Sequence, residues 1–117
     1  MSMQVDTVLE RLRADEAGMV QRLKDFLAFE SISTDPAYAP RVRACAQWLL
    51  EDIRKMGFNG ALHETAGHPM VVASHDGPPG YDGPRVLFYG HYDVQPVDPI
   101  ELWESPPFAA VVVDGPR

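Results

Sequence analysis

His91 and Asp93 are the residues whose types and spacing could carry chemistry in this sequence. They follow the apolar run VLFYG (86–90), with one residue between them. In extended backbone, positions i and i+2 share a face, so the two side chains are expected to lie together. Neutral imidazole is a good zinc ligand, and a nearby carboxylate can bind metal or accept a hydrogen bond from the second ring nitrogen. By spacing alone, the pair indicates either part of a metal site or a loop with satisfied hydrogen bonds.

The elements that must position this pair are predicted from the hydrophobic period. RVLFYG (85–90) is the strongest strand candidate, and its lack of polar alternation predicts a strand covered on both faces, as in an α/β sheet. Ligands of open α/β sheets bind beyond the ends of such strands. Gly90 is expected to let the chain turn sharply there. Three further strands are predicted, at GALHET (60–65), PMVVAS (69–74) and FAAVVVD (108–114).

Two amphipathic helices are predicted before the first strand. Apolar residues recur at spacings of three and four over 5–29 and again over about 40–56. Asp6 or Thr7 can cap the first helix, and Gly18 is the position at which an interruption is expected. The second helix ends in basic residues followed by a glycine, a typical stop signal.

Composition limits the class of protein. The chain has 117 residues, of which 45% are hydrophobic and 23% charged, as in one small globular domain. Its net charge of -7 gives no support for a nucleic-acid or anionic-membrane partner. The N-terminus resembles neither a signal peptide nor a membrane span, and the single cysteine cannot form an internal disulfide. We therefore expect a cytoplasmic protein.

The string GHYDVQP (90–96), followed by LWESPPF (102–108), closely resembles a family of zinc-dependent exopeptidases and amide hydrolases. The family includes aminoacylase, succinyl-diaminopimelate desuccinylase, glutamate carboxypeptidases and carnosinase-like dipeptidases. Its signature Gly-His-x-Asp-Val-x-Pro is matched by Gly90, His91, Asp93, Val94 and Pro96. Tyr92, Gln95 and Trp103 look most like the dipeptidase branch. The order of elements also agrees, including a loop with the SIST pattern between the two helices.

The resemblance implies an α/β fold, in which residues 1–117 form the N-terminal portion of a mixed-sheet, helix-flanked zinc exopeptidase catalytic domain. An inserted dimerisation domain would be absent, and the intact protein would be a homodimer. His91 would be a metal ligand, and Asp93 the catalytic-site carboxylate that orients it. Family members hold two metal ions, usually zinc, with manganese or cobalt as alternatives, and use a metal-activated water to cleave a dipeptide or a small N-acyl amino acid.

The resemblance places the bridging aspartate and the general-base glutamate after Arg117, so neither is assigned here. One histidine with one supporting carboxylate should not retain a dinuclear site. The 117 residues alone are therefore expected to be inactive and to bind zinc weakly. The alternative is a non-catalytic truncated fragment that acts as an interaction module through an unpaired sheet edge.

Other residues of reactive types are expected to be structural. Cys45 lies near the apolar stripe of the second helix and is predicted to be a small buried hydrophobe, not a nucleophile. Trp103 and Phe108 are expected to anchor a loop, with a role in lining a substrate pocket as the alternative. Three histidines are expected at the surface, with a role as metal ligands as the alternative: His63, His68 and His75.

Overall fold

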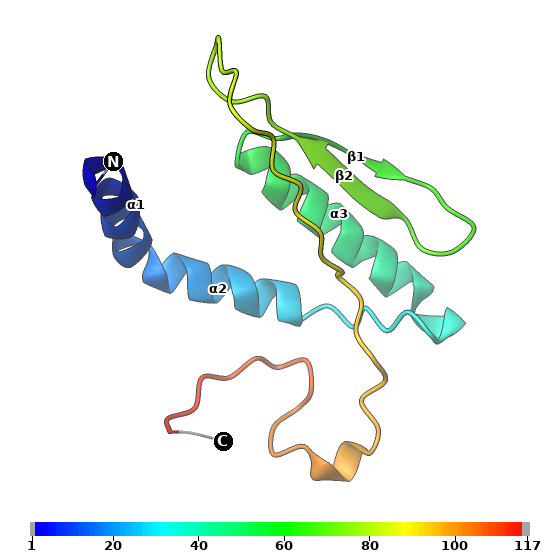
Figure 1. The fold of residues 1–117 in the computed structure, drawn as a ribbon. Helices are drawn as coiled ribbons and strands as arrows, with labels where there is room; N and C mark the ends of the chain where they lie inside the picture. The colour runs from blue at the N-terminus through cyan, green and yellow to red at the C-terminus, as the bar shows by residue number, and fades with distance from the viewer. Residues whose placement is uncertain (1, 116–117) are drawn as a thin grey trace. The chain divides into compact units, whose positions relative to one another are not determined.

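A computed structural model describes residues 2–115, in two compact units. The first unit is formed by residues up to Ala28 together with those from Trp103 onwards, and the second spans Phe29–Leu102. The chain combines helices with a two-stranded sheet (Figure 1), which agrees with the α/β class expected. His91 and Asp93 both belong to the second unit.

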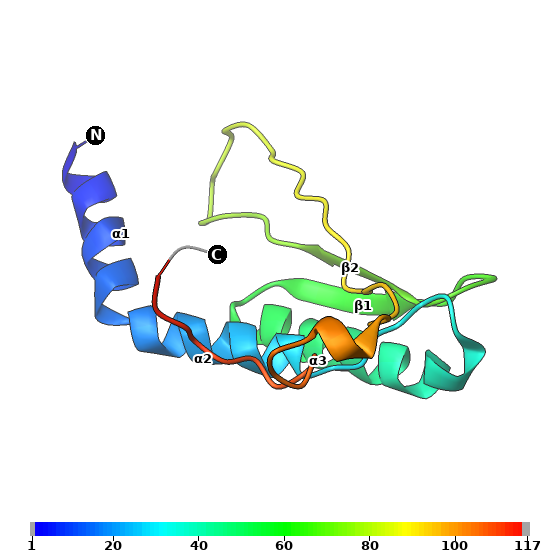
Figure 2. The same ribbon diagram turned by 90° about the horizontal axis from the view of Figure 1, so that it is seen from below.

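The second unit is built on one helix and one hairpin. Helix α3 (Ala39–Lys55) is followed by β1 (Asn59–His63) and β2 (Met70–Ser74), which pair antiparallel. Figures 1 and 2 show α3 lying along one face of this hairpin. The predicted second helix and the strands predicted at 60–65 and 69–74 are thus confirmed, with ends shifted by one or two residues. Short 3-10 helices, η1 (Pro36–Tyr38) and η2 (Ile100–Leu102), complete the unit.

The core of the second unit forms because the apolar positions of α3 recur every three or four residues and face the hairpin. Its buried hydrophobic side chains are Ile32, Val42, Cys45, Ala46 and Leu50. Gly60, in β1, allows the close approach, because an added Cβ would lie 2.9 Å from Leu50 Cδ1. The helix stops before Gly57, whose φ of 93° suits glycine far better than other residues.

The strand predicted at 85–90 is wrong for this structure. The segment, yellow in Figure 1, has no regular secondary structure, and its large apolar side chains are exposed, up to 94% for Leu87 and Tyr89. A strand requires hydrogen bonds from a neighbouring strand, and within residues 2–115 no strand pairs with this segment. The strand predicted at 108–114 is wrong for the same reason.

The first unit contains two helices where the sequence predicted one. Helix α1 (Ser2–Ala14) and helix α2 (Glu16–Leu27) are separated at Asp15, so the interruption falls three residues before Gly18. The Asp15 carboxylate lies over Gly18, at 2.3 Å from where a Cβ would be. Gly18 therefore leaves room for the Asp15 carboxylate, and the helix is not interrupted at Gly18 itself. The start at Ser2 precedes the caps predicted at Asp6 and Thr7.

Neither α1 nor α2 meets the length and apolarity needed to cross a bilayer, and the same holds for every other helix between residues 2 and 115.

Candidate functional site

Two extended segments meet in the second unit, one following α2 and the other carrying the GHYDV motif. The Val94 amide donates a hydrogen bond to the Ser31 carbonyl at 3.0 Å, and Ile32 and Val94 form an isolated parallel bridge. The Ser31 hydroxyl donates to the Tyr92 carbonyl at 2.8 Å. Because Ser31 and Ile32 are only 2% and 3% exposed, this junction fixes the motif to the core without a regular sheet.

The predicted pair is in contact. Nδ1 of His91 lies 3.0 Å from Oδ1 of Asp93 and 3.1 Å from the Asp93 carbonyl oxygen. Both partners are acceptors while the carboxyl group is ionised, so in the neutral ring the proton is on Nδ1 and Nε2 keeps its lone pair. The His91 side chain is 75% exposed, and no residue between 2 and 115 hydrogen-bonds to Nε2. The imidazole is thus held at one nitrogen and open at the other.

The Asp93 carboxylate is also held from its other side. The Ser33 hydroxyl donates to Oδ2 at 2.6 Å, across sixty residues of sequence. This hydrogen bond is the main reason that the pKa of Asp93 lies below its usual value, and the contact with His91 lowers it further. Partial burial acts in the opposite direction. The carboxylate therefore stays ionised at neutral pH and able to accept from both neighbours.

Tyr92 lies between these residues in sequence but faces the hairpin. Its hydroxyl donates to the Pro69 carbonyl at 2.5 Å, and burial is the main cause of a raised tyrosine pKa. Nearby, Nε2 of His68 lies 2.8 Å from the Ser33 carbonyl. The loop between β1 and β2 therefore contacts both segments that form the site.

The other residues singled out in the sequence lie outside the His91–Asp93 contact and differ in their burial. Cys45 is 0% exposed, and burial raises the pKa of its thiol, which confirms the prediction of a buried hydrophobe. His63 and His75 are exposed as expected, whereas His68 is partly buried. Gly90 has no positive φ, and a Cβ there would meet open space, so the sharp turn expected at this position is not found.

The geometry of the His91–Asp93 pair fits a metal ligand with a supporting carboxylate. Across positions 2–115 there is no group of three or more His, Cys, Asp or Glu side chains that could hold a metal ion. An exposed Nε2 with a fixed tautomer suits a single coordination position of a zinc or similar site. His91 therefore fits one corner of a metal site, and the described residues do not gather further metal-binding side chains around it.

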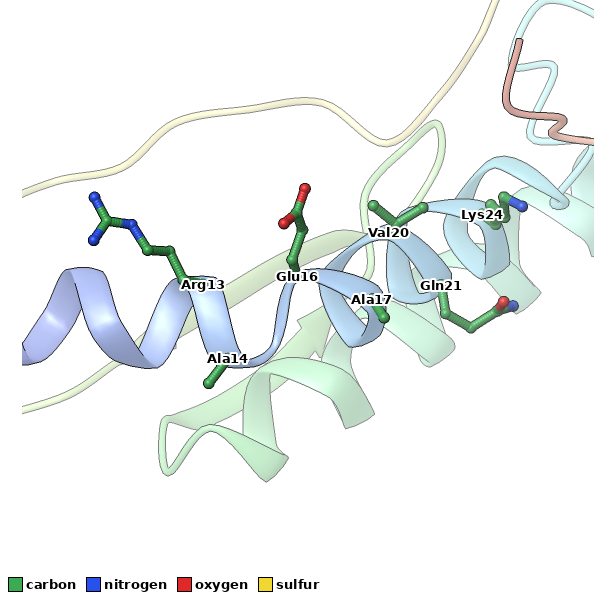
Figure 3. Close-up of a pocket in the computed structure, with 7 residues that line it drawn as sticks. All are labelled: Arg13, Ala14, Glu16, Ala17, Val20, Gln21 and Lys24. Atoms are coloured by element: carbon green, nitrogen blue, oxygen red, sulfur yellow. The ribbon is translucent and has the colours of Figure 1, made fainter. Parts of the chain in front are cut away.

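Two surface hollows lie in the first unit and contain neither residue of the pair. One, of about 350 Å³, is lined by Leu27, the half-exposed Trp103 and residues between 105 and 113; the role of Trp103 and of the partly buried Phe108 stays a prediction. The other, of about 570 Å³, lies along α1 and α2 (Figure 3). Its lining residues are Arg13, Ala14, Glu16, Ala17, Val20, Gln21 and Lys24.

Sequence reasoning missed Ser31 and Ser33. The SIST segment was noted only as part of the family pattern, because nothing local in it indicates chemistry. Its distance in sequence from the motif, sixty residues for Ser33 to Asp93, hides the contact. The available signal was the segment's place in the loop between the two predicted helices, in a family with that order of elements.

Comparison with known proteins gives relatives in one group of enzymes. The chain is 36% identical over 80 residues to a succinyl-diaminopimelate desuccinylase of Shewanella loihica, a match over 68% of this chain and 20% of the relative. It is 34% identical over 100 residues to a Cys-Gly metallodipeptidase of Candida albicans, over 76% and 21% of the two chains. A desuccinylase of Burkholderia multivorans is 33% identical over 86 residues, which make up 74% of this chain and 23% of the relative.

No family model and no solved structure matches the chain. The matches to the three relatives span between 20% and 23% of their lengths. All three are hydrolases by name, and the name that two of them carry, succinyl-diaminopimelate desuccinylase, is also among the enzymes that the motif resembles. The chain therefore belongs to the metal-dependent exopeptidase and amide hydrolase family that includes succinyl-diaminopimelate desuccinylase and Cys-Gly metallodipeptidase.

Proposed function

We propose that the natural protein hydrolyses the amide bond of dipeptides or related small N-acyl amino acids in a metal-dependent reaction. In this proposal His91 is a metal ligand, and Asp93 holds its imidazole. The observation that carries the proposal is the 3.0 Å contact between His91 Nδ1 and Asp93 Oδ1, which leaves Nε2 open. The names of the relatives, a desuccinylase and a metallodipeptidase, agree with amide substrates of this size.

The role of each residue follows from its hydrogen bonds. Asp93 accepts a hydrogen bond from Nδ1–H and so fixes the tautomer and the ring orientation of His91. Through this hydrogen bond the carboxylate also supports Nε2 as a metal ligand. Tyr92 and Val94 tie the backbone on either side of Asp93 to the core. A metal ion bound at Nε2, zinc by family expectation with manganese or cobalt as alternatives, would supply Lewis acidity and a water ionised near neutral pH.

We also propose that residues 1–117 are the N-terminal portion of a larger catalytic domain, which continues in a longer, homodimeric and cytoplasmic polypeptide. Two observations support this: the chain covers only a small part of its relatives' length, and the apolar run at 86–89 is exposed. The same exposed run favours the second candidate, a non-catalytic module that pairs with a partner. The presence or absence of further acidic and histidine ligands in the natural coding sequence separates the two.

The first test replaces the proposed ligand in the natural polypeptide. We expect His91→Ala to lower bound metal, measured by elemental analysis, and to lower hydrolysis of Cys-Gly and of N-succinyl-diaminopimelate by more than about 100-fold. Loss of a supporting group alone costs roughly 10- to 100-fold, so loss of the ligand should cost more. Retained activity and metal in this variant would overturn the assignment.

His63→Ala is the matched control. His63 is an exposed histidine at the end of β1, so its removal changes the same residue type outside the proposed site. We expect its metal content and activity to equal those of the wild type. An equal loss in both variants would show a general effect of histidine removal and contradict the specific role of His91.

A further inference from the structure

The two oxygens of the Asp93 carboxylate have different partners. Oδ1 lies 3.0 Å from His91 Nδ1, and Oδ2 accepts the Ser33 hydroxyl at 2.6 Å. The terminal torsion of aspartate is broad, so a carboxylate held at one oxygen alone can rotate away from its partner. The Ser33 hydrogen bond removes this freedom and leaves Oδ1 facing the imidazole.

Ser33 is itself fixed by its surroundings. It follows Ile32, which is 3% exposed, and Ser31, whose carbonyl receives the Val94 amide. Its own carbonyl lies 2.8 Å from His68 Nε2. The hydroxyl therefore approaches Asp93 from a backbone that is anchored on both sides of the contact.

We propose that Ser33 is a positioning residue for the metal ligand: through Asp93 it holds His91 in the Nδ1–H tautomer, with Nε2 free for metal. This inference rests on the proposed function for the metal, but the tautomer is a property of the protein without metal. The hydrogen bonds of the His91 ring within residues 2–115 go to Asp93 and not to Ser33, so Ser33 acts through the Asp93 carboxylate.

The test compares Ser33→Thr with Ser33→Val in the natural polypeptide. Thr and Val have nearly the same shape, and only Thr keeps the hydroxyl, so the pair separates the hydrogen bond from packing. Thr34→Val is the control, because Thr34 is the exposed neighbour, and the hydroxyl that donates to Asp93 within residues 2–115 is that of Ser33. Circular dichroism and the unfolding midpoint establish that each variant is folded.

The first measurement is the imidazole nitrogen chemical shifts of His91 in metal-free protein, at a pH where the ring is neutral. We expect the Nδ1–H tautomer in the wild type, in Ser33→Thr and in Thr34→Val, and a shift toward the Nε2–H tautomer in Ser33→Val. The same tautomer in Ser33→Val as in Ser33→Thr would overturn the proposal.

The second measurement is zinc affinity by competition with a chromophoric chelator. We expect Ser33→Val to bind zinc about tenfold more weakly than Ser33→Thr, in the range found for supporting groups. Equal affinities together with unchanged tautomers would refute the positioning role and leave the proposed function standing. Absence of zinc binding by the wild type, with the tautomer shift present, would refute the proposed function and support the positioning role.

Discussion

His91 exposes 75% of its side chain, whereas the groups that hold it lie deeper. Asp93 exposes 41% of its side chain, and Ser31 exposes 2%. This gradient suits a ligand that must be reached by metal and substrate but must not rotate. A single residue can be both exposed and ordered when its neighbours supply the hydrogen bonds, as Asp93 does at Nδ1.

Cys45 gives a prediction at the same scale. Burial raises the pKa of its thiol above the unfolded value, so its stabilising contribution is present below about pH 8.5 and is lost as pH rises through the folded pKa. The free energy of unfolding of the wild type should therefore fall more between about pH 7 and about pH 10 than that of Cys45→Ala. Urea titrations at both pH values measure this, and identical pH dependence in the two proteins would contradict it.

At the scale of elements, local sequence was sufficient to predict an element that makes its own hydrogen bonds or that pairs with its neighbour in the chain. The period of α3 and its glycine stop predicted the helix, and the hairpin β1–β2 joins adjacent segments. The interruption was expected at Gly18 and falls at Asp15, whose carboxylate lies over Gly18. The 85–90 strand was wrong because its partner strands cannot be inferred from its own residues.

Gly60 tests the packing of α3 on the hairpin. A methyl group there would lie 2.9 Å from Leu50 Cδ1 and 3.1 Å from Ala73 Cβ, and only the leucine end can move easily. Overpacking lowers the free energy of unfolding by about 1 to 3 kcal/mol, and the reduced conformational freedom of the unfolded chain raises it by about 0.4 to 1 kcal/mol. We therefore expect Gly60→Ala to lower the free energy of unfolding by about 1 kcal/mol in chemical denaturation.

Gly67→Ala is the matched control for this experiment. A methyl group at Gly67 would meet only Thr65 Oγ1 at 3.8 Å, an ordinary contact, and its φ is not in the left-handed region. Its unfolding free energy should stay within about 0.5 kcal/mol of the wild type. A Gly60→Ala protein as stable as this control would show that the helix and hairpin are not closely packed at that point.

At the scale of the whole molecule, the candidate site is partly predictable and partly not. The motif identified His91 and Asp93, and their contact follows from extended backbone. The Ser33 hydrogen bond joins distant segments, and residues 2–115 bring together no group of three or more His, Cys, Asp or Glu side chains that could hold a metal ion. Four consecutive large apolar residues, 86–89, are 72% to 94% exposed, which soluble proteins avoid unless other protein covers the surface.

Hydrogen exchange tests whether this run is covered in the natural protein. Within residues 2–115, the backbone amides of 86–89 have no hydrogen-bond partner, so in the 117-residue chain they should exchange rapidly. If the longer polypeptide adds strands beside them, their exchange should slow by about a thousandfold, the protection of a moderately stable sheet. The amide of Gly80, in the loop after β2, should exchange rapidly in both chains and serves as the internal control. Fast exchange at 86–89 in the natural polypeptide would contradict a completed catalytic sheet, and protection only after addition of a separate partner chain would favour the interaction module.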